Sequence, residues 1–213
     1  MRFSFDPDSL LMRTLSRVAD LALLNVVFLL TCLPIFTIGA ANTALYTVVF
    51  TMDTGREGKL LSGYFRAFRD NFRQSTLLWL IILLFGASTY VYMVQFSALG
   101  GSLGYVLLVL ATAILVTLLM VFSYAFPLFS QFSNTIRATA TNSRLLAVAY
   151  LPRSVILLVI NCFPWVLLFM NLYAFIHLGF LWFILYFAAA AYLNSRVLLK
   201  VFQPLREKAE SSR

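Results

Sequence analysis

CLPIFTIGAANTALYTVVFTM, residues 32–52, joins two apolar stretches of the chain and contains no charged residue. Pro34 lacks a backbone N–H and Gly39 relieves a tight bend, so we expect a helix to end between these two residues. The following segment, Ala40–Met52, has only about 13 residues, fewer than the roughly 20 that span a bilayer as a helix. The stretch therefore predicts a reversal of the chain at PIFTIG. To this structural turn we assign Pro34, Thr37, Gly39 and Ala40.

Two other interpretations of this stretch fit the sequence less well. A signal peptide would end near TIGAA, but its N-terminal region would then be about twenty residues long and carry three Asp residues, which is wrong for such peptides. A single bent helix would leave the basic residues 56–73 on the outer side of the membrane. We therefore expect the returning helix either to tilt through a thinned region or to pack inside the bundle as a short or re-entrant arm.

The composition of the whole chain indicates a membrane protein. Hydrophobic residues make up 62% of the 213 residues and charged residues 11%, against roughly 25% charged residues in an average soluble domain. So little polar surface could not cover a soluble core. Several apolar runs approach the length of a spanning helix, and the polar alternation that a spanning strand requires is missing. The sequence predicts an all-α, polytopic helical membrane bundle.

The positions of the charged residues indicate how the chain crosses the membrane. All Lys and Arg residues fall within four segments, residues 2–17, 56–73, 137–153 and 196–213. The intervals 74–136 and 154–195 contain no Asp, Glu, Lys or Arg. The positive-inside rule places basic segments on the cytoplasmic side, so an even number of crossings joins each consecutive pair. The Lys and Arg residues behind the net charge of +8 are placed by this topology. The charge is therefore no sign of a nucleic-acid-binding surface, and we expect no binding of nucleic acid.

The resulting prediction is one integral membrane domain, residues 1–213, with about five long spanning helices, one short or re-entrant helix and both termini in the cytoplasm. The outer turns are expected at SALGGSLG and near NLYAFIH. The expected hairpins lie at about 15–52, 75–129 and 154–200, the cytoplasmic loops at about 53–74 and 130–153, and the polar tail at 203–213.

The second basic segment contains an amphipathic pattern. At about 100° per residue, the apolar side chains of KLLSGYFRAFRDNFRQS fall in one sector of a helix over residues 60–73, and the charged ones fall in the opposite sector. Such a helix either lies on the inner leaflet and leads into the next span, or docks on a partner. The apolar sector holds Leu60, Leu61, Tyr64, Phe65, Phe68 and Phe72, and the charged sector holds Lys59, Arg66, Arg69, Asp70 and Arg73. Our candidate docking residues are Phe65, Arg66, Phe68, Arg69, Asn71 and Phe72.

The predicted membrane region offers neutral polar side chains rather than titratable ones. The main candidates are Asn25, Asn42, Ser123, Asn161 and Asn194. They could hydrogen-bond a hydroxylated solute, or they could join one helix to another. An enzyme needs a nucleophile, a base or metal ligands that converge, and the uncharged intervals supply no carboxylate for that purpose. We therefore expect no catalytic, cofactor-binding or metal-binding residues and no enzymatic activity.

Three motifs resemble the YesL-like family of bacterial integral membrane proteins: LPIFTIGAANTALY at 33–46, GYFRAFRDNFRQS at 63–75 and ATNSRLLAVAYLPRS at 140–154. The positions that fit the family are Pro34, Thr37, Gly39, Ala40, Ala44, Leu45, Phe65, Phe68, Asn71, Phe72, Asn142 and Pro152. The resemblance implies a multi-pass protein of the bacterial cytoplasmic (inner) membrane. The family has no established biochemical activity. Its members often sit beside genes for carbohydrate importers of the ATP-binding-cassette (ABC) kind and for polysaccharide breakdown.

The resemblance implies a role associated with sugar uptake. Two missing motifs argue against the roles of ATP-hydrolysing subunit and ordinary permease subunit. The ATP-binding motif G-x-x-x-x-G-K-[ST] does not occur, and the second basic segment lacks the acidic-Ala-Ala pattern that importer permease subunits carry. We therefore expect a non-enzymatic accessory subunit or regulator of a carbohydrate ABC importer, docking through helix 60–73. A small transporter of a neutral solute and a structural or lipid-organising protein remain as alternatives. The expected partners are the lipid bilayer, importer permease subunits and further copies of this chain.

Overall fold

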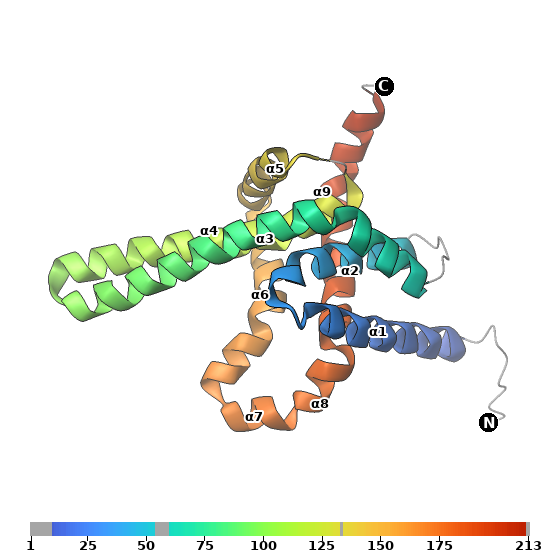
Figure 1. Ribbon diagram of the computed structural model, residues 1–213, viewed down its shortest axis with the longest axis horizontal. Coiled ribbons are helices and arrows are strands. Elements are labelled where there is room, and N and C mark those ends of the chain that lie inside the picture. Colours follow the sequence, from blue (N-terminus) through green and yellow to red (C-terminus); the bar gives the residue numbers. More distant parts are fainter. Residues whose placement is uncertain (1–9, 54–59, 133, 212–213) are drawn as a thin grey trace.

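The computed structural model describes residues 10–53, 60–132 and 134–211, which form helices joined by short turns (Figure 1). The helices are, in chain order, α1 (Leu10–Cys32), a 3-10 helix (Ile35–Thr37), α2 (Ile38–Asp53), α3 (Leu60–Leu99), α4 (Gly101–Gln131), α5 (Ile136–Ala149), α6 (Leu151–Met170), α7 (Leu172–His177), α8 (Gly179–Leu181), a π-helix (Trp182–Tyr186) and α9 (Phe187–Ser211).

Six helical segments in the described part of the chain are long and apolar enough to cross a membrane. They are Met12–Cys32, Ile35–Met52, Leu60–Leu99, Gly101–Gln131, Leu151–Met170 and Gly179–Leu205. This finding confirms the predicted fold class, a polytopic helical membrane bundle. Their apolar parts fall in the intervals between the basic segments because a spanning helix excludes charge from the hydrocarbon layer, while Met12–Cys32, Leu60–Leu99 and Gly179–Leu205 each extend into a basic segment at one end.

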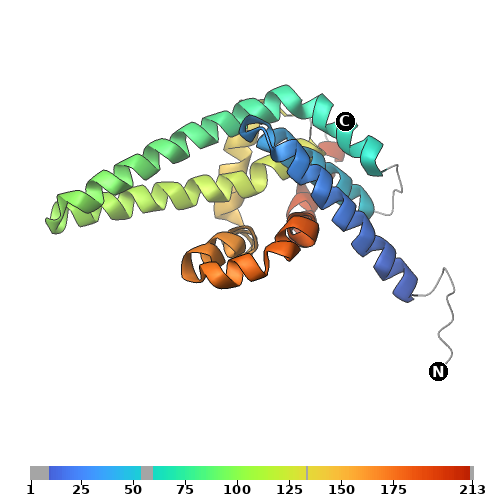
Figure 2. The same ribbon diagram turned by 60° about the horizontal axis from the view of Figure 1, so that its bottom comes forward.

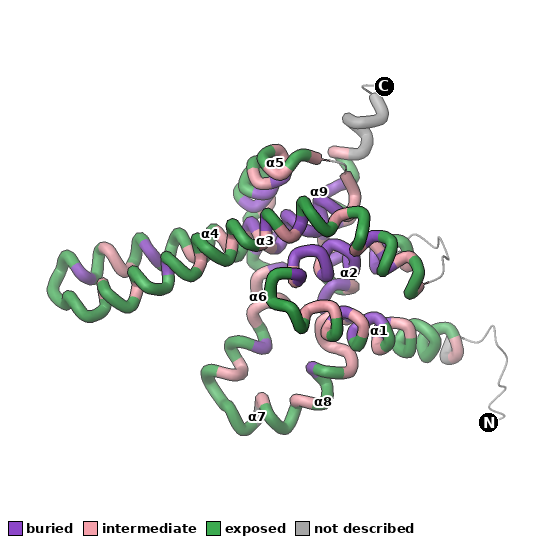
Figure 3. The backbone as a smooth tube through the Cα atoms, in the orientation of Figure 1, coloured by how far each residue is buried: buried purple, intermediate pink, exposed green. Residues whose placement is uncertain are grey.

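Helix α2 is short but lies at the centre of the molecule, where Figure 3 shows the densest burial. It packs against α1, α3, α4 and α9. Ala40, Ala41 and Ala44 are fully buried on it, and such small side chains allow neighbouring helices to approach closely. Leu45 and Val49 belong to the main apolar cluster of the protein. Of the two arrangements expected for the short helix, its burial favours packing inside the bundle.

Helix α3 differs from the sequence-based expectation, which placed a separate cytoplasmic helix over 60–73 before a span beginning at Ser75. The structure has one continuous helix from Leu60 to Leu99. Its 40 residues correspond to a length of about 60 Å at 1.5 Å per residue, twice the roughly 30 Å of the hydrocarbon layer. The physical reason is that the sequence contains no proline between residues 60 and 99, so nothing ends the helix where the polar residues give way to apolar ones.

Helices α3 and α4 form a long antiparallel hairpin. The reversal occurs at Gly100 and Gly101, whose φ angles of 62° and 65° are accessible to glycine at little steric cost. This position lies within the turn expected at SALGGSLG. Toward the tip the two helices contact each other along one seam, while their remaining faces are exposed, uncharged and mainly apolar. Such a surface is suited to contact with lipid.

The second hairpin, α6 to α9, leaves the α2 core in a different direction from the α3–α4 hairpin (Figures 1 and 2). The short helices α7 and α8 close its tip, close to the turn expected near NLYAFIH. Helix α5 packs mainly against α4, and Pro152 stands in the first turn of α6, where a proline is tolerated because that N–H has no partner within the helix.

The predicted crossing scheme can be tested with reporter fusions. A reporter that is active only in the cytoplasm should be active when it is fused after Asn134 or at Arg213, because Asn134 lies just before the third basic segment and Arg213 ends the fourth. A fusion at Gly101 or Tyr173, at the tips of the two hairpins, should be silent. Reporter activity after each fusion in intact cells is the measurement, and an active fusion at Gly101 would contradict the scheme.

Candidate functional site

The turn between α1 and α2 is held by its own hydrogen bonds and by α3. The carbonyl oxygen of Pro34 accepts from the backbone N–H of Thr37 at 2.9 Å. The buried hydroxyl of Thr37 lies 2.6 Å from the same oxygen and 2.5 Å from the carbonyl oxygen of Thr31, near the end of α1. From α3, the indole N–H of Trp79 donates to the carbonyl oxygen of Ile35 at 2.7 Å. The chain thus reverses at Pro34 and Thr37, and α3 fixes the turn from outside.

Gly39, in the first turn of α2, marks a close approach of α2 to α3. A Cβ atom at this position would overlap the carbonyl oxygen of Ser75 and would lie 2.6 Å from the Cβ of Trp79. One turn further along, the hydroxyls of Thr43 and Ser75 share a hydrogen bond of 2.9 Å. The φ angle of Gly39 is not positive, so this position needs the absence of a side chain rather than a special backbone conformation. Its neighbour Ala40 is fully buried.

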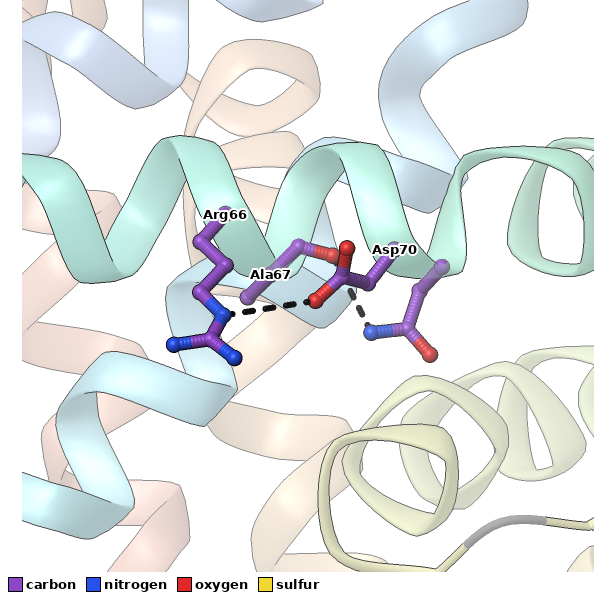
Figure 4. A network of polar contacts seen from close by, with 4 residues as sticks. Arg66, Ala67 and Asp70 are labelled. Carbon is purple, nitrogen blue, oxygen red and sulfur yellow. Dashed lines mark hydrogen bonds and ion pairs between the residues drawn. The ribbon is translucent and has the colours of Figure 1, made fainter.

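The outer face of the first turns of α3 forms an open groove of about 900 Å³, which we call the α3 groove. Aromatic and charged side chains alternate along it, with Phe65 52% exposed. Arg66 and Asp70 form an ion pair one turn apart, with 3.8 Å between Arg66 Nε and Asp70 Oδ2 (Figure 4). Their side chains are 83% and 56% exposed, so the pair contributes little to stability. The groove is lined by Ser62, Phe65, Arg66, Phe68, Arg69, Asp70, Phe72 and Arg73.

The groove includes five of the six predicted docking residues. Asn71 is the exception, because it is half-buried and its Nδ2 donates to the carbonyl oxygen of Ala67 at 3.0 Å within α3. Tyr64 also departs from the expectation that it shares an apolar sector with Phe65 and Phe72. It is fully buried against the core, and its hydroxyl lies 2.6 Å from that of Thr31 on α1.

The aromatic sector therefore divides into a core face and a groove face. The core face could have been recognised from the sequence, because residues of the same helical face continue from Tyr64 into the membrane segment. Tyr64, Ala67, Ser75 and Leu78 are all buried, and their separations of three, eight and three residues place them on one face of the helix. Tyr64 and Ser75 of this stripe contact α2, the helix with the most extensive contact to α3, whereas Leu78 packs against Ala125 and Phe129 of α4.

Three of the predicted polar residues meet in the interior, where they form a chain of hydrogen bonds across four helices. Asn161 on α6 donates from Nδ2 to the Ser123 hydroxyl on α4 at 3.1 Å. Asn194 on α9 donates from Nδ2 to Asn161 Oδ1 at 2.8 Å and to the Tyr46 hydroxyl on α2 at 3.1 Å. Sequence reasoning did not select Tyr46, because a tyrosine in a mostly apolar segment resembles any other core aromatic residue. Asn42 is half-buried and lies outside this chain of hydrogen bonds.

Asn25 has a different role, because it completes the backbone hydrogen bonding of the π-helix. Its Nδ2 lies 3.1 Å from the carbonyl oxygen of Trp182 and 2.7 Å from that of Phe183, and it donates to both. Its Oδ1 accepts from the backbone N–H of Ala188 at 2.9 Å. One fully buried side chain on α1 thus pairs three backbone groups where the α-helical ladder of the last span is interrupted.

The model of DUF624, a protein family of unknown function, matches residues 21–93. The YesL-like proteins, which the sequence resembles, belong to that family. No curated protein and no solved structure matches the chain. The matched segment covers about a third of the chain and holds the α1–α2 turn, Gly39 and the α3 groove.

Proposed function

We propose that the protein is a non-enzymatic accessory subunit of a carbohydrate ABC importer of the bacterial inner membrane, and that it docks on the importer's permease through the α3 groove. The observation that carries this proposal is the exposed combination of phenylalanine and arginine side chains in the groove. The link to an importer comes from the resemblance of the α1–α2 turn and the first half of α3 to YesL-like proteins.

The chemistry of the groove supports docking on a protein. Aromatic residues and arginine are the residue types that protein interfaces favour. Burying the exposed half of Phe65 would contribute about 1 kcal/mol, and each charge-assisted hydrogen bond from an arginine about 1.5–3 kcal/mol. Arg66, Arg69 and Arg73 outnumber Asp70 in the groove, so the complementary surface on the partner is apolar with acidic residues beside it.

A double substitution tests this proposal. Arg66→Gln together with Arg69→Gln should weaken the capture of the importer permease by about 100-fold or more, because two charge-assisted contacts are lost. Sugar-dependent growth should fall in parallel. The protein should still insert, since Arg73 and the other basic segments continue to direct the topology. Co-purification from gentle detergent, quantified against the unaltered protein, is the measurement.

The matched control is Arg137→Gln with Arg144→Gln, which removes the same charge from exposed positions on α5 and should leave capture unchanged. A self-contained transporter of a neutral solute would behave differently, because its solute path would run among the uncharged spans. Uptake of a sugar into vesicles by the purified protein alone, at a rate that the Arg66 and Arg69 substitutions do not alter, would contradict the accessory role.

A further inference from the structure

A buried side chain at the junction of α2, α4, α6 and α9 has more hydrogen-bonding capacity than its neighbours satisfy. Asn194 is fully buried, and its Nδ2 donates to both the Tyr46 hydroxyl and Asn161 Oδ1. Its Oδ1 is equally buried and has no hydrogen-bond partner among the described residues. A buried polar atom without a partner costs about 1–3 kcal/mol, and such atoms are rare in folded proteins.

The Tyr46 hydroxyl adds an unused donor at the same place. Tyr46 is 4% exposed, and its oxygen accepts from Asn194 Nδ2. Within the described part of the chain, its own proton has no acceptor. A phenolic hydroxyl can donate one hydrogen bond as well as accept. The unfilled acceptor on Asn194 and the unfilled donor on Tyr46 therefore belong to two side chains that are already in contact.

The orientation of the two amide groups decides which of these atoms lack a partner. Rotating an amide by half a turn exchanges its oxygen and nitrogen. With both Asn161 and Asn194 rotated, Tyr46 and Asn161 would each donate to Asn194 Oδ1, and Nδ2 of Asn194 would take the place that lacks a partner. The rotated arrangement would use the Tyr46 proton, but it would turn Asn161 Oδ1 toward the Ser123 hydroxyl, whose proton already goes to the carbonyl oxygen of Leu119 at 2.9 Å. The described orientation makes more hydrogen bonds, and in it Asn194 Oδ1 and the Tyr46 proton both lack a partner among the described residues.

We propose that Tyr46 and Asn194 form a binding site for one small neutral hydroxyl-bearing molecule, which accepts from Tyr46 and donates to Asn194. A hydroxyl fits because it is donor and acceptor at once. The molecule is neutral because Tyr46, Ser123, Asn161 and Asn194 are all uncharged, and burying an ion among them would cost far more than burying a hydroxyl. Water and the hydroxyl of a neutral polyol share this chemistry. The site is separate from the α3 groove and independent of the docking role.

Density maps and thermal unfolding of the purified full-length protein test the site. Without added polyol, a map that resolves ordered water should show density within about 3 Å of both Tyr46 Oη and Asn194 Oδ1. Thermal unfolding is then followed with glycerol and with D-glucose as probes, in the unaltered protein, in Tyr46→Phe and in Tyr124→Phe. Tyr124 is the matched control because its buried hydroxyl already pairs with the Ser154 hydroxyl at 2.9 Å.

The outcomes separate the two sources of the hydroxyl. Density without a polyol-dependent rise in Tm identifies water. A rise in Tm that occurs in the unaltered protein and in Tyr124→Phe, but not in Tyr46→Phe, identifies a polyol. A rise that Tyr46→Phe retains is nonspecific and supports nothing at this site. The proposal is overturned if the map shows ordered water elsewhere but none here and no polyol produces a rise that depends on Tyr46.

Discussion

Replacing Gly39 by alanine should lower the Tm of the detergent-solubilised protein, whereas the same change at Gly86 should leave Tm unchanged or raise it. The added Cβ at Gly39 would overlap the carbonyl oxygen of Ser75 and approach the Cβ of Trp79. Neither obstacle is the free end of a flexible side chain, so α2 and α3 would have to separate. Overpacking of this kind costs about 1–3 kcal/mol and occasionally more, and at about 3 kcal/mol Tm would fall by roughly 6–12 °C.

Gly86 provides the control within the same helix pair. It lies in α3, and a Cβ there would meet nothing within 4 Å. Alanine is favoured over glycine inside a helix by about 0.5–1 kcal/mol, so the two substitutions should shift Tm in opposite directions. Equal tolerance at both positions would remove the close-packing role that we assign to Gly39.

Asn25→Leu should be the second strongly destabilising change. The substitution keeps the branching at Cγ but leaves the carbonyl groups of Trp182 and Phe183 and the N–H of Ala188 without the Asn25 side chain as a partner. A polar side chain between membrane helices contributes about 0.6 kcal/mol on average, but here three backbone groups, two of them in buried hydrogen bonds and one in a part-buried one, depend on one side chain. At about 1 kcal/mol each, the lower limit for an unpaired buried group, the loss is about 3 kcal/mol, or roughly 6–12 °C in Tm.

Asn42→Leu is the matched control. It makes the same chemical change at a half-buried position away from the π-helix. Its effect on Tm should be small. If Asn25→Leu were equally mild, the segment Trp182–Tyr186 would have to restore its own hydrogen bonds by winding into a regular α-helix, and Asn25 would not be needed to hold the π-helix.

The sequence predicted the fold class and the helices in outline, because the constraints that a bilayer imposes can be recognised from the order of residues along the chain. Charge is confined to segments outside the hydrocarbon layer, and each apolar interval must hold a whole number of helices. Pro34 likewise indicated where α1 ends, because a missing N–H acts locally. These features depend on single residues or on length, and neither requires knowledge of which helices become neighbours.

Features that depend on neighbouring helices were harder to predict. The aromatic sector of residues 60–73 looked uniform, but contact with α2 buries Tyr64 while Phe65 stays exposed. The list of intramembrane polar residues included Ser123, Asn161 and Asn194, yet only packing brings them together with Tyr46. The π-helix and its dependence on Asn25 carry no recognisable sequence pattern, since the two segments are more than 150 residues apart.

The contact between Gly39 and Ser75 divides α3 into two arms of unequal length. From Ser75 the helix continues 15 residues back to Leu60 and 24 residues onward to Leu99, about 22 Å and 36 Å at 1.5 Å per residue. The shorter arm is anchored in the core, because Tyr64 and Ala67 are buried. A 10° tilt of the longer arm about this contact would therefore displace the hairpin tip at Gly100 by about 6 Å and leave the α3 groove in place.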